Sequence, residues 1–557
     1  MSAPAPESWT VGAYLVERLR QVGVGHVFGV PGDYVLQFMD EIVASDVELV
    51  GTCNELNAGY AADAYARLNG VGAVCVTYAV GGFSVLNAIA GAFAERVPVV
   101  AISGGPSLAD RKRRRLLHHT LGDYDVQVAV FEHVTERSIL LDDAARAPEQ
   151  IDSTLRACLS SSRPVFIEVP ADMVAAPCSA PEPFEFSSRP ASDPDVLQEA
   201  VEEAARLLSA AQRPLLLGGV EVHRFGLQDE LEALIDHMGV PIATALMGKS
   251  VIRETHPQYV GVYSGALSED YVRELVEGAD CVLSLGAWMS DINLGVYTAK
   301  IDPQVLIHAS ADRVQIKHHY FDRVYLGDFI ESLQGALPAR ESPVLVRPAS
   351  RALAADFAPD FAKAITIERF YARMNHFLGD ENVVLADAGD SFLCAGDLLI
   401  HDDVGFICQA FYCSIGFTVP AALGVGLADP TRRPVLFVGD GAFQMTAQEL
   451  STLIRHRLNP VIFLMNNRGY TVERVIHDGP YNDIANWQYS ALPAVFGGGW
   501  SCQVRTEGEL EPALVRALAE PDELAFIEVQ IDPLDCSAAL TRLGRELAKQ
   551  RGFAPAS

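Results

Sequence analysis

The sequence predicts an α/β protein built from three doubly wound parallel-sheet domains. The chain has 557 residues, which is too long for one hydrophobic core and fits about three domains of common size. Short β-branched runs alternate with helical patterns along its whole length, as in layered α/β folds. Two proline-rich stretches, 175–195 and 338–350, have the composition of surface linkers. We therefore expect domains over residues 1–180, 195–338 and 355–557.

Each predicted domain contains apolar runs that we expect to form buried parallel strands. In the first domain, two such runs flank a helical pattern over residues 83–95. The runs are GAVCVTY (72–78) and VPVVAISG (97–104) in the first domain, RPLLLGG (213–219) and ADCVLSLG (279–286) in the second, and ENVVLADAG (381–389), RPVLFVGDG (433–441) and NPVIFLMNN (459–467) in the third.

The composition excludes several classes of protein. Hydrophobic residues make up 49% and charged residues 20%, an ordinary globular balance, and no apolar run approaches the ~20 residues of a membrane span. A net charge of −30 disfavours nucleic acid and anionic membranes as partners. The N-terminal segment lacks a secretory pattern, and the ten cysteines show no metal or disulfide spacing, so we expect a cytoplasmic protein.

One local exception to the negative charge is the basic run RKRRR at 111–115. Such a run is commonly a solvated loop. Its position just before two histidines leaves a second interpretation open, namely a local positive field that attracts an anionic acid toward a nearby site.

The third domain carries the most specific pattern. A predicted strand ends at Gly439-Asp440-Gly441, and the next predicted strand ends at Asn466-Asn467. A strand–helix–strand crossover places both strand ends at one sheet edge, so Asp440 and Asn467 are expected to meet there. A carboxylate and an amide oxygen suit a hard cation that also takes phosphate oxygens, and Gly441 would let a diphosphate approach the backbone. GDG alone is also simply a good turn, so the interpretation depends on the pair.

This pair of motifs resembles the cofactor motif of thiamine-diphosphate enzymes. The resemblance implies thiamine diphosphate as cofactor and Mg²⁺ held by Asp440, Asn467 and the carbonyl of Gly469. It also implies that the three domains are pyrimidine-binding, central and diphosphate-binding. Further cofactor contacts implied by the resemblance come from Gly441, Ala442, Tyr470, Asp390 and Ser391, with the last two facing the diphosphate.

Glu55 lies just after a predicted strand, in the opening turn of a predicted helix within CNELNAGYAADAYAR (53–67). By itself it is explained as a helix-start acid stabilised by the helix dipole. The segment also resembles the activating-glutamate segment of the thiamine-diphosphate superfamily. That resemblance implies a hydrogen bond from Glu55 to the cofactor's N1′, which drives the imino tautomer from which the C2 carbanion forms.

The segment QAFYCSIGFTVPAALG (409–424) resembles the region that bends the cofactor. The resemblance implies that Ile415 is the apolar wedge between the two cofactor rings, although an isoleucine here also fits an ordinary core. Cys413 stands where the family has a glycine whose carbonyl contacts the aminopyrimidine, and it is expected to keep that backbone contact.

Four further residues indicate which reaction the cofactor serves. Asp33 precedes a predicted helix and could be an N-cap, His118 and His119 could be solvated loop residues, and Glu473 could be a first-turn acid. Together they resemble the proton-handling set of the pyruvate and indolepyruvate decarboxylase family. The resemblance covers essentially the whole chain.

The resemblance implies an enzyme, a carboxy-lyase that converts a 2-oxo acid to an aldehyde and CO₂ without oxidation. Glu473 would assist decarboxylation and proton transfer, and the other three would assist protonation and product release. The family's first and third domains meet across a subunit boundary, which implies a homodimer or homotetramer with the active site between subunits.

The substrate pocket is expected to accept pyruvate and also longer branched or aromatic 2-oxo acids. By resemblance it is lined by Ala388, Phe392, Leu393, Val472 and Ile476. Single methylenes in such a pocket change discrimination by only ~1–3 kcal/mol, which favours tolerance over exclusivity.

Three alternatives differ in function. A flavin-dependent 2-oxo acid oxidase of the same fold is disfavoured by the histidine pair and Glu473. A carboligating synthase would have to be distinguished by its products. A non-catalytic relative would have lost Glu55, Asp440 or Asn467, and all three are present.

Overall fold

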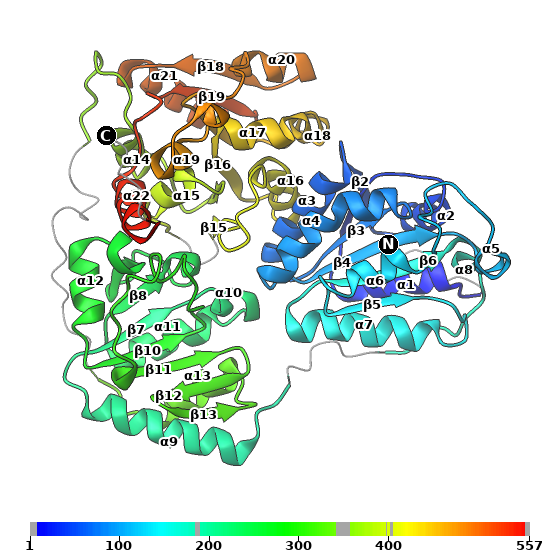
Figure 1. The fold of residues 1–557 in the computed structure, drawn as a ribbon, viewed down its shortest axis with the longest axis horizontal. Coiled ribbons are helices and arrows are strands. Elements are labelled where there is room, and N and C mark those ends of the chain that lie inside the picture. The colour runs from blue at the N-terminus through cyan, green and yellow to red at the C-terminus, as the bar shows by residue number, and fades with distance from the viewer. Residues whose placement is uncertain (1–7, 184–189, 341–356, 397, 402–404, 552–557) are drawn as a thin grey trace.

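The computed structural model describes residues 8–183, 190–340, 357–396, 398–401 and 405–551. These residues form three α/β units, each built on one sheet (Figure 1). Both expected linkers fall partly outside the described residues. The predicted fold class is confirmed.

The first sheet has six parallel strands in the order β2-β1-β3-β4-β6-β5. Its strands are β1 (His26–Gly29), β2 (Glu48–Gly51), β3 (Gly72–Val76), β4 (Val99–Gly105), β5 (Arg137–Leu140) and β6 (Val165–Pro170). Its helices are α1 (Val11–Gln21), α2 (Leu36–Val43), α3 (Glu55–Asn69), α4 (Val80–Ala94), α5 (Leu108–Arg113), α6 (Val126–Phe131), α7 (Ala147–Ser161) and α8 (Ala171–Val174). Every residue of β3 and β4 is buried, as expected for parallel strands covered on both faces.

The central sheet has seven strands in the order β13-β12-β11-β10-β7-β8-β9. Its strands are β7 (Pro214–Gly218), β8 (Ile242–Ala245), β9 (Tyr259–Tyr263), β10 (Cys281–Leu285), β11 (Leu306–Ser310), β12 (Arg313–Ile316) and β13 (His319–Asp322). Its helices are α9 (Pro194–Ala210), α10 (Glu221–Phe225), α11 (Gln228–Met238), α12 (Asp270–Glu277) and α13 (Leu326–Ala336). Strands β11, β12 and β13 pair antiparallel, so a short meander is added to one edge of the parallel sheet.

The third sheet has six parallel strands in the order β15-β14-β16-β17-β19-β18. Its strands are β14 (Asn382–Ala386), β15 (Phe406–Ile407), β16 (Arg433–Gly439), β17 (Val461–Asn466), β18 (Trp500–Val504) and β19 (Ala525–Gln530). Its helices are α14 (Ile367–Met374), α15 (Asp390–Ala395), α16 (Thr418–Ala428), α17 (Asp440–Thr446), α18 (Leu450–Arg455), α19 (Thr471–Ile476), α20 (Leu492–Phe496), α21 (Glu507–Ala519) and α22 (Ala538–Arg551).

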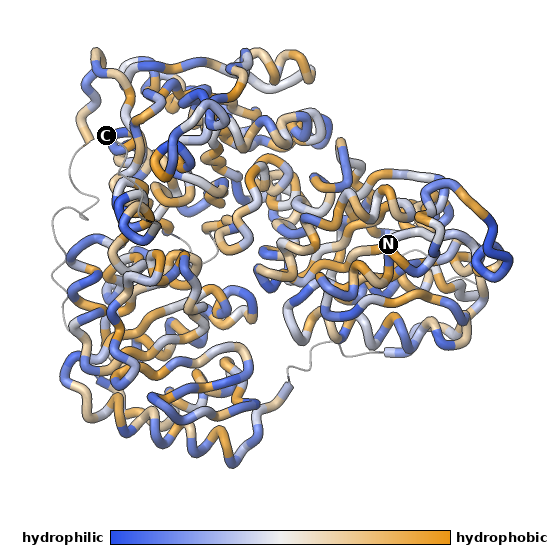
Figure 2. Tube along the Cα trace, in the orientation of Figure 1, coloured by the Kyte–Doolittle hydropathy of each residue, from blue (hydrophilic) through white to orange (hydrophobic). Residues whose placement is uncertain are grey.

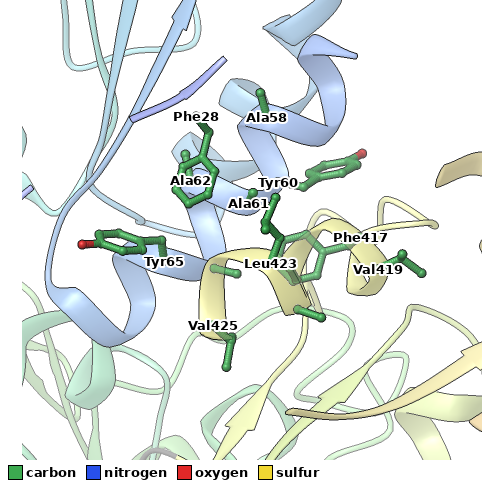
Figure 3. Close-up of a cluster of buried hydrophobic side chains, with 14 of the residues drawn as sticks. Phe28, Ala58, Tyr60, Ala61, Ala62, Tyr65, Phe417, Val419, Leu423 and Val425 are labelled. Carbon is green, nitrogen blue, oxygen red and sulfur yellow. The ribbon is translucent and has the colours of Figure 1, made fainter. Parts of the chain in front are cut away.

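The first and third units share one buried apolar cluster where α3 packs against α16 (Figure 3). Side chains of both helices face one another there, including those of Ala61 and Leu423. Gly424 allows the close approach, because a Cβ at this position would overlap the backbone oxygen of Ala61. The helix that begins at Glu55 is therefore fixed against the domain that carries the metal motif.

A chain of buried charges joins all three units. Arg67 Nε lies 2.6 Å from Asp63 Oδ1, and its Nη1 donates to the backbone oxygen of Cys408 at 2.9 Å. Arg224 of α10 donates through Nε to the backbone oxygen of Glu95 at 2.7 Å, and its Nη2 lies 3.4 Å from Glu95 Oε2. Burial, together with the nearby Arg67, lowers the pKa of Arg224 to about 10.

Hydropathy follows this architecture. The strands are largely apolar, and a hydrophilic tip marks the region of α5 (Figure 2). In the part of the chain that the structure describes, no helix combines the length and apolar character that a membrane span needs.

Candidate active site

The metal motif forms a tight corner at the carboxyl edge of the third sheet. Strand β16 ends at Gly439 and α17 begins at Asp440, without a loop between them. The Asp440 side chain is fully buried, and its carboxylate is held by backbone donors. Its Oδ1 accepts from the Gly441 N–H at 2.8 Å, and its Oδ2 accepts from the Arg468 N–H at 2.6 Å. Burial raises the pKa of Asp440 to about 6.

Three oxygens converge at this corner. In one orientation of the Asn467 amide, its oxygen lies 3.2 Å from Asp440 Oδ1 and 2.8 Å from the backbone oxygen of Gly469. In the other orientation its nitrogen donates to both of these atoms. Octahedral Mg²⁺ at 2.0–2.1 Å from its ligands requires neighbouring oxygens about 3 Å apart. The donor set and its spacing therefore fit Mg²⁺ as the sequence predicts.

Gly441 and Tyr470 lie against each other beside this corner. A Cβ on Gly441 would overlap the Tyr470 ring, so the glycine lets this ring pack directly on the backbone at the start of α17. The free N–H groups at a helix start can receive an anion. Ala442 follows on the same helix and is buried.

The Asp390 carboxylate is turned toward residue 537. It accepts from the Ser537 N–H at 2.9 Å and from the Ser537 hydroxyl at 2.5 Å. Burial raises the pKa of Asp390. Ser391 is also buried, and its backbone oxygen accepts from the Tyr371 hydroxyl at 3.3 Å.

Glu55 is the first residue of α3, and the preceding Asn54 caps the helix by accepting from the Asn57 N–H. Its side chain is partly buried, with Oε1 close to Gly81. Within the described residues no hydrogen bond to its carboxylate is recorded. The carboxyl group is thus positioned by the helix start and open to a ligand.

Asp33, His118 and His119 are brought together in the first domain, although 85 positions separate Asp33 from His118. His118 Nε2 lies 2.6 Å from Asp33 Oδ2, and the two imidazole rings are 4.8 Å apart between centroids. Tyr34 packs on both rings. The cluster is open, with 54% of the Asp33 side chain and 60% of the His118 side chain exposed. Asp33 is not an N-cap, because Val35 occupies that position of α2.

Glu473 lies in the first turn of α19 and is exposed. Among the described residues no recorded hydrogen bond or ion pair joins it to Asp33, His118 or His119. Within one chain, the metal corner and the Asp–His cluster therefore form two separate groups.

The segment around Ile415 is fixed by Asp387, a residue that the sequence analysis did not single out. The Asp387 carboxylate accepts from the Gly416 N–H and the Thr418 N–H, both at 3.0 Å. Burial raises the pKa of Asp387 to about 6. Its position at the end of the predicted strand in ENVVLADAG is the signal that could have revealed it.

Two neighbours on this segment bear on the cofactor prediction. Ile415 is half-buried against the cluster shared by α3 and α16. Cys413 has φ +56°, a left-handed conformation that favours glycine, which agrees with the glycine expected there. Ser414 lies between them, and its hydroxyl accepts from the Asn87 amide at 3.1 Å.

The five residues expected to line the substrate pocket lie in different surroundings. Phe392 is buried and lines a small cavity next to Arg224 and Met247 of the central unit. Leu393 lines another cavity, beside Leu246. Val472 lies close to Gly389. The remaining two, Ala388 and Ile476, are partly exposed.

The basic segment is divided between structural and exposed charges. Arg111 is largely buried, forms an ion pair with the buried Glu168, and lies 3.2 Å from Asp125 Oδ1. Arg115 pairs with Asp110 at 2.8 Å. The three residues between them, 112–114, are exposed. The sequence could not reveal the partner of Arg111, because Glu168 lies 57 positions away.

Comparison with known proteins matches all three units. Family models of thiamine pyrophosphate enzymes match residues 9–130 (N-terminal TPP binding domain), 201–335 (central domain) and 387–529 (C-terminal TPP binding domain). The fold is thus that of a thiamine-diphosphate enzyme, and Asp440, Asn467 and Gly469 lie within the matched C-terminal TPP binding domain.

Two relatives align over nearly their whole length. Pyruvate decarboxylase 3 of Arabidopsis thaliana is 37% identical over 562 residues, which cover 98% of this chain and 94% of that protein. An alpha-keto-acid decarboxylase of Mycobacterium leprae (strain TN) is 38% identical over 555 residues, covering 98% and 97%. This chain belongs to the thiamine-diphosphate-dependent 2-oxo acid decarboxylase family. It is a carboxy-lyase whose cofactor is thiamine diphosphate, with Mg²⁺ as the usual partner metal of the family.

Proposed function

We propose that this enzyme decarboxylates pyruvate and also longer branched or aromatic 2-oxo acids, releasing the corresponding aldehyde and CO₂. The observation that carries the proposal is the exposed Asp33–His118–His119 cluster, in which Asp33 and His118 are hydrogen-bonded and the polar atoms of all three side chains lie within 4.8 Å of one another. Non-oxidative decarboxylation needs such a group, because the carbon that loses CO₂ has to be protonated.

The bound thiamine diphosphate supplies the carbon nucleophile and the electron sink for loss of CO₂. Asp440, Asn467 and the Gly469 carbonyl would hold Mg²⁺, and the N–H groups at the start of α17 beside Gly441 would receive the diphosphate. Glu55 would hold a proton at the aminopyrimidine N1′, and Ile415 would be the apolar wedge between the cofactor rings.

The remaining groups handle the substrate's protons. Glu473 assists loss of CO₂ and proton transfer at the reacting carbon. His118 and His119 deliver and remove protons, and Asp33 holds the His118 ring through its hydrogen bond to Nε2.

We further propose that the active site forms between two copies of the chain, in a homodimer or homotetramer. The exposed Asp–His cluster and Glu473 support this, because within the described residues no recorded hydrogen bond or ion pair joins the one to the other. The domain boundaries 1–180, 195–338 and 355–557 and a cytoplasmic location complete the proposal. All ten cysteines are free thiols, which supports a reducing compartment.

The first experiment is an aldehyde-release assay with added thiamine diphosphate and Mg²⁺. Glu55→Gln keeps the shape of the side chain and removes the acid, so aldehyde formation should fall by at least about 100-fold. Glu132→Gln, an exposed acid of the same domain, should retain wild-type activity. Unchanged activity in Glu55→Gln would remove Glu55 from the mechanism.

The substrate range is tested by kcat/KM for pyruvate, 2-oxoisovalerate and phenylpyruvate. We expect the three values to lie within about 200-fold of one another, the discrimination that one methylene in an apolar pocket can provide. A strict preference for pyruvate would contradict a broad pocket and leave the decarboxylation itself unaffected.

A further inference from the structure

Arg474 is a buried cation beside the metal motif that the proposed mechanism does not use. It lies on α19, one residue after Glu473, and only 6% of its side chain is exposed. A buried guanidinium is costly unless its donors are satisfied. Its surroundings show how the structure meets this cost.

Four oxygens accept hydrogen bonds from this one guanidinium. Its Nη1 donates to the backbone oxygens of Asn467 at 3.2 Å and Pro533 at 3.3 Å. Its Nη2 donates to the backbone oxygen of Arg468 and to Asp483 Oδ1, both at 2.8 Å. Two of these acceptors belong to the short segment between the metal ligands Asn467 and Gly469.

The same segment is fixed from its other side. The Arg468 N–H donates to Asp440 Oδ2 at 2.6 Å, and the Tyr470 N–H donates to the backbone oxygen of Asn482 at 2.9 Å. Gly469 packs directly on the guanidinium, because a Cβ there would overlap Arg474 Nη2. With the carbonyls of 467 and 468 committed to Arg474, the Gly469 carbonyl is left to face the Asn467 amide.

We propose that Arg474, anchored by Asp483, is a positioning residue that preorganises the Mg²⁺-binding segment 467–469. It touches neither metal nor substrate and acts by fixing the orientation of two peptide groups. The inference rests on the proposed function, since it takes Asp440, Asn467 and Gly469 as the metal ligands. Outer groups that orient ligands in this way typically change metal affinity by about 10–100-fold when removed.

The test measures Mg²⁺ binding directly, by calorimetric titration of MgCl₂ into EDTA-stripped full-length protein with saturating thiamine diphosphate. We expect Arg474→Met to weaken Mg²⁺ binding about 10–100-fold. Arg505→Met is the matched control. Arg505 is an exposed arginine of the same domain that lies outside the metal-binding segment, and its loss removes the same charge. This control should bind Mg²⁺ within about twofold of wild type.

Two further readouts separate positioning from general damage. Backbone hydrogen exchange over residues 467–484 of the metal-free protein should speed up in Arg474→Met and stay unchanged in Arg505→Met. Decarboxylase activity of Arg474→Met should recover at excess Mg²⁺, which a folding lesion would not do. If Arg474→Met does not fold, Arg474→Lys and Asp483→Asn provide the test, because each keeps part of the hydrogen-bonding group and should give a smaller loss in the same direction.

The outcomes also distinguish this inference from the proposed metal site. If Asp440→Asn binds Mg²⁺ normally, the assignment of the metal ligands fails. If Asp440→Asn loses Mg²⁺ binding while Arg474→Met retains wild-type affinity and exchange, only the positioning role is overturned.

Discussion

The metal corner of the third domain and the Asp–His cluster of the first domain differ in how the fold holds them. Asp440 is fully buried and bound by backbone N–H groups on both carboxylate oxygens. Asp33 and His118 are more than half exposed and hold each other by one short hydrogen bond. A metal ligand has to be fixed to within a few tenths of an ångström, whereas proton-transfer groups need access to substrate and water. The contrast shows that one chain by itself completes the buried Asp440 corner, whereas the Asp–His cluster remains open at the surface.

The largest loss of activity should come from a substitution in the buried metal corner. Asp440→Asn keeps the shape of the side chain and removes the charge that holds Mg²⁺, so we expect decarboxylase activity to fall by more than about 100-fold, beyond the loss typical of outer-sphere residues. Aldehyde release measured across a Mg²⁺ titration tests this. Asp522→Asn, an exposed acid of the same domain, is the control. Wild-type activity in Asp440→Asn would contradict the proposal that the Asp440 charge is needed to hold Mg²⁺.

A substitution in the exposed Asp–His cluster should lower the reaction rate without lowering the stability of the fold. His118→Gln removes a proton-transfer group and should lower kcat by about 10²–10⁴-fold. Its unfolding free energy should change by less than about 0.5 kcal/mol, because the side chain is exposed. Denaturant unfolding and steady-state kinetics on the same preparation measure both quantities, with the exposed His319→Gln of the central domain as control.

The Asp33–His118 pair should behave as a unit. The double variant Asp33→Asn/His118→Gln should therefore lose less rate than the product of the two single losses. Simple multiplicative losses would indicate independent roles.

The unfolding free energy should depend on pH through the buried Asp387 of the third domain. Burial raises its pKa from 3.8 to about 6, so between about pH 4 and 6 the folded protein holds a proton that the unfolded chain has released. The unfolding free energy should therefore decrease as pH rises through this window, by up to about 1.4 kcal/mol per pH unit from this one group. Denaturant unfolding at several pH values should show this slope removed in Asp387→Asn. An identical slope in the variant would show that Asp387 is not the source of this pH dependence.

The smallest effect concerns the one strained position near the wedge. Cys413 adopts φ +56°, and a non-glycine residue there costs about 1 kcal/mol, partly offset by the greater freedom of glycine in the unfolded chain. Cys413→Gly should therefore raise the unfolding free energy by up to about 1 kcal/mol. Cys413→Ser keeps a Cβ and should give no gain. Equal stabilities in both variants would show that the backbone carries no strain at this point.

The sequence predicted the features that depend on local patterns. Buried parallel strands are continuous apolar runs, so β3, β4, β7, β10, β14, β16 and β17 all fall on the predicted runs. The meeting of Asp440 and Asn467 follows from the handedness and direction of a crossover unit, and the structure places them together.

What could not be predicted depends on long-range partners. The edge strand β13 and its neighbour β12 are short and partly exposed, so they lack the apolar run that identifies a strand. Arg111 belonged to a run that composition alone assigns to solvent, and only the fold shows its pairing with Glu168. Arg474 and Asp387 act through backbone groups, which carry no signature in the side-chain pattern.

The buried charges at the junction of the three units limit the motions open to this enzyme. Rotating the central unit away from the first would break the buried contact of Arg224 with Glu95. The same Glu95 carboxylate accepts from the Phe411 N–H at 2.6 Å, so its loss would also remove a hydrogen bond to the third unit. These shared contacts favour catalysis with the three domains held in one arrangement.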